Sequence, residues 1–291
     1  MDLGNNLFVG PIPFWSDGLV LKYLNLESNK FTGEIPLHLC QLENLQYLSL
    51  ARNKLTGTIP RCFGNLSGMR NHDNSRDFFR NYEENIWASV KGLQLMYIKI
   101  TLEFLTSLDL SSNNIVGEIP DTLMNLVELR NLNLSGNLLK GQIPKTIGDL
   151  KQLESLDLSS NKLYGRIPQS LTRLNFLSYL NLSFNSLSGP IPVGNQLQTL
   201  DDLSIYEGNS GLCGLPVSTR CNVGHGDDSE GVWFYAGMGP GFVAGFIGLF
   251  GSLTFIRSWK LAYFETLENV YAWLRLLVEL NLNRLRRKVF E

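Results

Sequence analysis

The stretch LESLDLSSNKLYGRIP (residues 153–168) is followed, 24 residues later, by LSYLNLSFNSLSGPIP (residues 177–192). In both stretches leucines alternate with polar residues, and an Asn, a Gly and an Ile-Pro pair follow at the same spacing. The whole chain holds 53 leucines and 27 asparagines among its 291 residues, far from an average composition. A biased composition with a fixed period indicates an internal repeat.

The pattern N-x-[aromatic or aliphatic]-x-G-x-I-P occurs seven times along the chain, and L-x-x-L-x-L precedes most of its copies. Its first residue is Asn6, Asn29, Asn53, Asn113, Asn137, Asn161 or Asn185. The steps are 23 or 24 residues except one of 60, which is one period plus 36 residues. This is the leucine-rich-repeat signature. A leucine-rich helical bundle is the alternative, but a Pro in every period would break its helices.

The residue types of the repeat predict a solenoid. Each L-x-L segment is a short strand whose leucines point inward, because side chains alternate with period 2. One coil cannot bury its leucines alone, so coils stack and share a core. We expect parallel strands on the concave face, an irregular or 3-10 convex side, then a single transmembrane helix and a short cytoplasmic amphipathic helix. The recurring Asn is expected to bond backbone groups of the turn after the strand.

Polar residues occupy the middle of successive L-x-L strands. They are Asn25, Ser49, Asp109 and Asp157, together with Asn133 and Asn181. These residues are expected to form a solvent-facing column on the concave side, which is the typical binding surface of a solenoid. A solvated side chain without a binding role is the alternative for each of them.

Nearly all extra residues of the long step fall within an island at residues 69–103, between repeats at 1–68 and at 104–194. The island mixes charges of both signs with aromatic residues, among them Phe78, Phe79, Tyr82 and Trp87. Loops of this length are often functional, and exposed aromatics suit recognition of a ligand or partner. A disordered or self-packed insertion that covers the side of the solenoid is the alternative.

The four cysteines suggest two disulfides. Cys213 and Cys221 lie eight residues apart in a Gly/Pro-rich cap at residues 195–222, where a disulfide is favoured over a zinc site because no second Cys pair lies nearby. Cys40 and Cys62 lie on adjacent coils, where a disulfide and two free thiols both remain open. N-x-S sequons begin at Asn65, Asn133 and Asn181. Sequons and disulfides together favour an extracellular compartment.

Residues 233–256 carry no charge and are long enough to cross a bilayer as a helix. An acidic linker at residues 223–232 precedes them and basic residues follow, which places the repeats outside the cell and the C-terminus inside. Gly237, Gly241 and Gly245 repeat every four residues and predict pairing with another membrane helix. The tail, residues 257–291, predicts an amphipathic helix on the inner leaflet and is too short for a kinase domain.

Composition argues against several other functions. A net charge of −2 disfavours a nucleic-acid binder. Three scattered histidines leave little material for a metal centre, and no cofactor is expected. The repeats offer no convergent nucleophile, base and orienting group, so we do not expect an enzyme.

Four segments resemble a known family. They are LTSLDLSSNNIVGEIP (105–120), GNSGLCGLP (208–216), FYAGMGPGFVAGF (234–246) and RSWKLAYF (257–264). They resemble the C-terminal portion of plant leucine-rich-repeat receptor-like proteins, the group that includes ethylene-inducing-xylanase receptors and Cf-type resistance proteins. The resemblance implies a kinase-less plasma-membrane receptor, immune or developmental, that binds an extracellular peptide or protein. It implies an adaptor receptor kinase paired through the membrane helix and a co-receptor kinase bound through the C-terminal repeats.

Two other functions remain as alternatives. The first is a wall-associated inhibitor that blocks a microbial polysaccharide hydrolase with its concave face, although such an inhibitor needs no membrane segment. The second is a truncated, non-signalling decoy or remnant. It is motivated by the opening at Met1-Asp2-Leu3-Gly4, inside a repeat, where the family has a signal peptide, a cap and more repeats.

Overall fold

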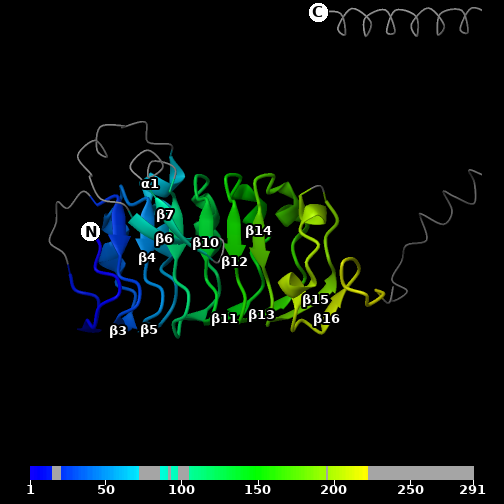
Figure 1. Cartoon of the computed structure of the whole chain (residues 1–291), viewed down its shortest axis with the longest axis horizontal. Coiled ribbons are helices and arrows are strands. Elements are labelled where there is room, and N and C mark those ends of the chain that lie inside the picture. The colour runs from blue at the N-terminus through cyan, green and yellow to red at the C-terminus, as the bar shows by residue number, and fades with distance from the viewer. Residues whose placement is uncertain (15–20, 72–85, 91–92, 98–104, 195, 222–291) are drawn as a thin grey trace, which may run out of the picture. The chain divides into compact units, whose positions relative to one another are not determined.

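The computed structural model describes residues 1–14, 21–71, 86–90, 93–97, 105–194 and 196–221. Within residues 1–222, which form one compact unit, successive coils stack side by side as a solenoid (Figure 1). The expected linker, membrane span and tail at residues 223–291 lie outside the described residues. None of the helices in the described part of the chain is long and apolar enough to cross a membrane.

A six-stranded parallel sheet lines the concave side. Its strands, in spatial order, are β2 (Tyr23–Asn25), β4 (Tyr47–Ser49), β8 (Ser107–Asp109), β10 (Asn131–Asn133), β12 (Ser155–Asp157) and β14 (Tyr179–Asn181). Their central leucines pair in register, from Leu24 and Leu48 to Leu156 and Leu180. These leucines belong to one continuous hydrophobic core. The predicted solenoid with parallel strands is therefore confirmed.

A second row of strands runs along the side of the solenoid, which the sequence pattern did not predict. One lateral sheet holds β1 (Val9–Gly10), β3 (Lys30–Glu34) and β5 (Lys54–Thr56). The other holds β9 (Val116–Gly117), β11 (Leu138–Gly141), β13 (Lys162–Gly165), β15 (Ser186–Pro190) and β16 (Gly211–Cys213). The repeat Gly is the last residue of β1, β9, β11 and β13 and has a positive φ there, +92° at Gly141, a conformation that favours glycine.

Short 3-10 helices form the convex side, and most begin directly after the Ile-Pro pair. They are η1 (Leu37–Gln41), η2 (Arg61–Asn65), η4 (Asp121–Asn125), η5 (Ile147–Asp149), η6 (Gln169–Arg173), η7 (Leu197–Thr199) and η8 (Leu203–Tyr206), with one α-turn, α1 (Ser67–Arg70). Pro fixes φ and lacks an N–H, which suits the residue where the chain leaves the lateral strand.

The repeated asparagines form a ladder of hydrogen bonds between coils. The side-chain amide of Asn137 donates to the carbonyls of Leu134, Ser135 and Leu110 at 3.1, 3.2 and 3.0 Å, and its oxygen accepts from the Ile115 N–H at 3.1 Å. Asn209 makes the equivalent bonds 24 residues after Asn185, although its segment lacks the full motif. The ladder therefore extends one coil beyond the repeats that the sequence motif identifies.

The island interrupts the sequence but not the solenoid. β4 pairs directly with β8, with Tyr47 opposite Ser107. The ladder is also continuous, because Asn113 accepts from the Leu55 N–H at 3.0 Å and donates to the Leu50 carbonyl at 2.9 Å. Within the island, β6 (Ile86–Val90) and β7 (Leu93–Tyr97) pair as an antiparallel hairpin. The insertion therefore leaves the stack and returns to it at neighbouring coils.

Candidate ligand-binding surface

The polar column of the concave sheet divides into a buried half and a more open half. Asn25, Ser49 and Asp109 are only 5, 0 and 1% exposed. Asp157, at the same register position in β12, is half-buried. The expectation of a solvent-facing column is therefore corrected for the first three residues, because other groups cover the sheet at β2, β4 and β8. Of the four positions proposed for binding, Asp157 is the one that solvent reaches.

The buried half contains a carboxyl group with an altered pKa. Burial raises the pKa of Asp109 to about 6, and the Glu27 carboxylate adds to this rise. Hydrogen bonds act in the opposite direction, since the Ser111 N–H donates to one Asp109 oxygen at 3.0 Å and Asn133 donates to the other at 3.4 Å. Asp109 is therefore a buried carboxyl group of the concave sheet, and hydrogen bonds offset only part of the rise in its pKa.

Two stacked tyrosines lie beside this carboxyl. The rings of Tyr23 and Tyr47 are 4.4 Å apart between centroids and tilted by 16°. Tyr47 is 2% exposed, and burial, more than the neighbouring charged groups, raises its pKa well above the ordinary value. The two rings form a flat aromatic surface that is buried.

The open half carries polar side chains that hold one another in place. Arg130 donates to Glu154 at 2.7 Å. The Tyr179 hydroxyl lies 3.4 Å from one oxygen of Asp157, whose other oxygen accepts from the backbone and hydroxyl of Ser159. Such preordered groups lose little entropy when they bind a partner.

The island hairpin reaches towards this open half. Tyr97, the last residue of β7, is half-buried, and burial together with the Glu154 carboxylate raises its pKa. The carboxylate therefore lies near the end of the hairpin. Of the island aromatics named above, Phe78, Phe79 and Tyr82 lie outside the described residues, and Trp87 is placed in β6 by its backbone.

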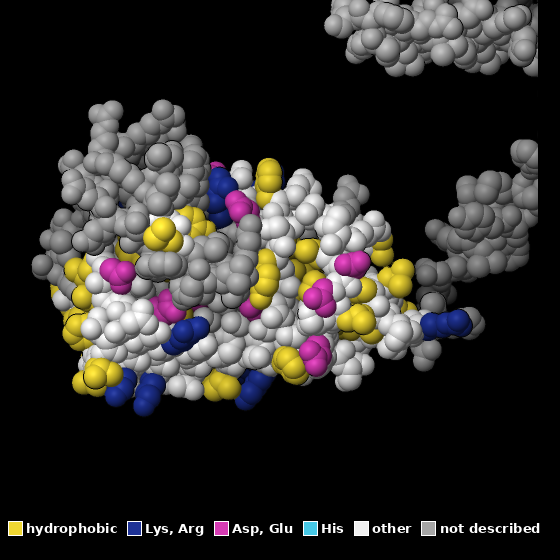
Figure 2. Space-filling model, in the orientation of Figure 1, with side chains coloured by type: hydrophobic (Ala, Val, Ile, Leu, Met, Phe, Trp, Pro, Cys, Tyr) yellow, Lys and Arg dark blue, Asp and Glu magenta, His cyan; other side chains and the backbone are white. Residues whose placement is uncertain are grey.

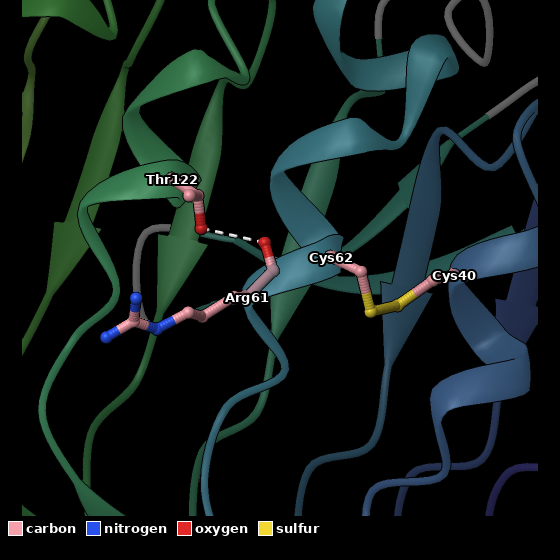
Figure 3. Close-up of a disulfide and its surroundings, with 4 residues drawn as sticks. All are labelled: Cys40, Arg61, Cys62 and Thr122. Carbon is pink, nitrogen blue, oxygen red and sulfur yellow. Dashed lines mark hydrogen bonds between the residues drawn. A yellow bond between two sulfur atoms is a disulfide. The ribbon is translucent and has the colours of Figure 1, made fainter.

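The cysteines are joined in two pairs. Cys40 of η1 and Cys62 of η2 form a disulfide with a Cα–Cα distance of 5.8 Å, and Cys213 is bonded to Cys221 in the cap. The Thr122 hydroxyl donates to the Arg61 carbonyl beside the first disulfide at 2.7 Å (Figure 3). These links join η1, η2 and η4, the convex segments on both sides of the island.

The three sequon asparagines occupy two different surfaces. Asn65 is exposed at the end of η2. Asn133 and Asn181 end concave strands, are half-buried, and each accepts a hydroxyl bond at 2.7 Å from the Ser two residues later. A glycan on Asn65 would lie on the convex side, whereas glycans on the other two would cover the concave sheet.

The lateral sheets carry a row of lysines. Lys30, Lys54 and Lys162 each follow a ladder asparagine directly, Lys140 lies opposite Lys162, and all four are exposed. Figure 2 shows several Lys and Arg side chains along the lower edge, where the lateral strands run (Figure 1). These four lysines therefore lie on the lateral sheets and not on the concave sheet.

The hollows of the surface follow the repeat. One of about 590 Å³ is lined by Glu118, Gln142 and Ile143, and another of about 910 Å³ by Gln142, Arg166 and Pro190. Gln142, Arg166 and Pro190 occupy one position of three successive repeats, so the stacking of coils itself produces these hollows. Among the described residues there is no group of three or more His, Cys, Asp or Glu side chains placed to hold a metal ion.

Comparison with known proteins agrees with this architecture. A family model described as Leucine Rich Repeat matches residues 20–42, 44–66, 104–126, 128–150, 152–174 and 176–197. Receptor-like protein EIX2 of Solanum lycopersicum is 49% identical over 318 aligned residues, which cover 99% of this chain and 31% of that protein. The chain belongs to the plant leucine-rich-repeat receptor-like proteins. It spans about a third of the length of this curated relative.

Two solved receptors share the fold of this receptor-like protein. The leucine-rich-repeat ectodomain of the receptor kinase GASSHO1/SCHENGEN3 from Arabidopsis thaliana, solved in complex with CASPARIAN STRIP INTEGRITY FACTOR 2, is 32% identical, with a TM-score of 0.52, over 76% of this chain and 25% of that one. The plant peptide hormone receptor RGFR1, solved in complex with RGF2, is 34% identical, with a TM-score of 0.51, over 64% of this chain and 24% of that one.

Proposed function

We propose that this chain is part of a kinase-less receptor of the plant cell surface that binds an extracellular peptide or protein. The observation that carries the proposal is the 49% identity to receptor-like protein EIX2 across 99% of the chain. The similarity to ectodomains solved with RGF2 and CASPARIAN STRIP INTEGRITY FACTOR 2 supports a peptide or protein as the ligand. The proposed role is plant immune recognition.

The ligand would contact the open half of the concave face and the neighbouring island. Glu154, Asp157 and Tyr179 present oxygen atoms there that are accessible and partly ordered. Because Asn25, Ser49 and Asp109 are buried, they would support this surface rather than touch the ligand.

Signalling would come from partner kinases, with the repeats outside the cell and the C-terminus inside. In this proposal the apolar residues 233–256 form a single membrane helix that packs against an adaptor receptor kinase through Gly237, Gly241 and Gly245. A co-receptor kinase would bind the C-terminal repeats once the ligand is in place.

The test is co-immunoprecipitation of receptor kinases with the tagged full chain from plant cells. The triple change Gly237→Leu, Gly241→Leu and Gly245→Leu should abolish kinase association, because the larger side chains prevent close helix approach. Val243→Leu, on the other side of such a helix, is the matched control and should retain the kinase. Equal association of the triple variant and the control would refute the helix contact.

A further inference from the structure

The two halves of the concave sheet are built from the same repeat but differ in burial. Outward-facing positions of β4 and β8 are closed to solvent, with Tyr47, Ser49 and Asp109 at 2, 0 and 1% exposure. Asp157 and Asn181, in the same row as Ser49 and Asp109, are half-buried, and so is Tyr179, in the same row as Tyr47. Since strand register and backbone are the same in both halves, the repeat itself does not explain the difference. A separate part of the chain must cover the first half.

The island hairpin is in the right place to supply this cover. The chain leaves the solenoid after α1 and returns before β8, at the two coils whose concave side chains are most deeply buried. In the view of Figure 1, β6 and β7 overlap the region of the concave strands between the labels β4 and β10. At the end of β7, Tyr97 is half-buried whereas Met96 is 51% exposed, so one side of the strand end packs against other residues. The Glu154 carboxylate also contributes to the raised pKa of Tyr97, which agrees with a hairpin on the concave side.

We propose that the hairpin β6–β7 is docked on the concave face over β4 and β8 and acts as an internal occupant of that half. An external partner then reaches only the half formed by β12 and β14. The inference concerns contacts within this chain, so it stands whether or not the proposed receptor function is correct.

Docking is favourable both for the hairpin β6–β7 and for the concave surface that it covers. A two-stranded hairpin is marginally stable alone in water and needs a surface to pack against. The stacked rings of Tyr23 and Tyr47, whose centroids are 4.4 Å apart, offer a flat apolar surface for the hairpin. At its boundary the Arg130–Glu154 pair lies close to Tyr97. Docking therefore stabilises the hairpin and removes aromatic surface from water.

A deletion that keeps the repeat period tests the proposal. Removing residues 69–104 takes out 36 residues and joins Gly68 to Leu105, so that Asn53 and Asn113 become 24 positions apart. Hydroxyl-radical footprinting of the full chain and the deletion variant then reports the accessibility of each tyrosine. Labelling of Tyr47 should rise several-fold in the variant, because its cover is gone.

Two tyrosines of the same protein serve as internal controls. Tyr206, 4% exposed in the cap, should stay protected in both proteins, and Tyr164, 50% exposed on β13, should label strongly in both. Protection of Tyr206 also reports that the variant is folded. If Tyr47 stays as protected as Tyr206 in a folded variant, the docking proposal is wrong.

A cross-link in the full-length chain tests the same contact without the deletion. A Tyr97→Lys variant places an amine at the end of β7, and a carbodiimide should join it to the Glu154 carboxyl. Mass spectrometry should find the peptide of residue 97 linked to Glu154, and the added change Glu154→Gln should remove that product. Absence of the link in a variant whose Tyr47 stays protected would overturn the proposal.

Discussion

At the scale of single residues, a ladder asparagine such as Asn137 makes four hydrogen bonds with one side chain. From Asn29 onwards, each amide group donates within its own turn and to the preceding coil, and its oxygen accepts from that coil, as at Asn161 and Asn185. A buried backbone group that loses its partner costs about 1–3 kcal/mol. One side chain therefore stabilises both a turn and the contact between two coils.

Replacing Asn137 tests this role. Asn137→Ala leaves the Ile115 N–H without its acceptor and removes a donor from three carbonyls, so the free energy of unfolding should fall by about 3 kcal/mol. Chemical denaturation followed by circular dichroism measures the change. Asn114→Ala, at an exposed neighbouring position, is the control, and an equal loss in both variants would contradict the ladder argument.

The buried carboxyl of Asp109 predicts a dependence of stability on pH. Its pKa is about 6 in the folded chain, above the ordinary value of 3.8, so the folded state holds the proton more tightly than the unfolded state. Stability should therefore fall as the pH rises from about 4 to about 6, by at most about 3 kcal/mol. Above this window the contribution should be constant.

Substitution identifies the group responsible for this slope. Asp109→Asn removes the titrating carboxyl and should flatten the decline in melting temperature between these pH values. Asp157→Asn changes the equivalent residue of β12 and leaves the Asp109 carboxyl in place, so the slope should persist. An unchanged slope in Asp109→Asn would assign the effect to another group.

At the scale of elements, the convex side near the island is held by a covalent bond. The Cys40–Cys62 disulfide joins η1 to η2 across 22 residues of sequence. Replacing both by Ala should lower the free energy of unfolding by about 3 kcal/mol. The Cys213–Cys221 disulfide closes a shorter loop of 8 residues. The matched double change Cys213→Ala and Cys221→Ala should therefore lower the free energy of unfolding by less. A larger loss for the cap pair, measured by denaturant unfolding, would contradict this ranking.

The elements also show what the sequence could and could not predict. The period of leucine and asparagine was enough to predict the stacked concave strands, because both residues act through local and nearest-neighbour contacts. The lateral strands were missed, since their L-x-G segments look like turns until neighbouring coils supply the hydrogen bonds. Burial of Ser49 and Asp109 was missed for a similar reason, because their cover comes from outside the repeat and no local pattern reports it.

At the scale of the whole molecule, the positions of the sequons predict which one carries a glycan. Asn65 is exposed on the convex side, so it should be modified if the repeats enter the secretory pathway. Asn65→Gln should remove one glycan from the intact mass without changing the circular dichroism spectrum. Asn71→Gln, also exposed but outside a sequon, should leave the mass of the glycoprotein almost unchanged. An unglycosylated Asn65 would argue against extracellular repeats.

The unbroken stack beneath the island also has an evolutionary consequence. Because the ladder and the sheet pass directly from the coil of Asn53 to that of Asn113, the scaffold does not restrict how many residues are inserted there. Doubling the length of such a loop adds only about 0.6 kcal/mol of closure entropy. New recognition segments can therefore be grafted or lost at this one point while the core stays the same, which lets specificity diversify faster than the fold.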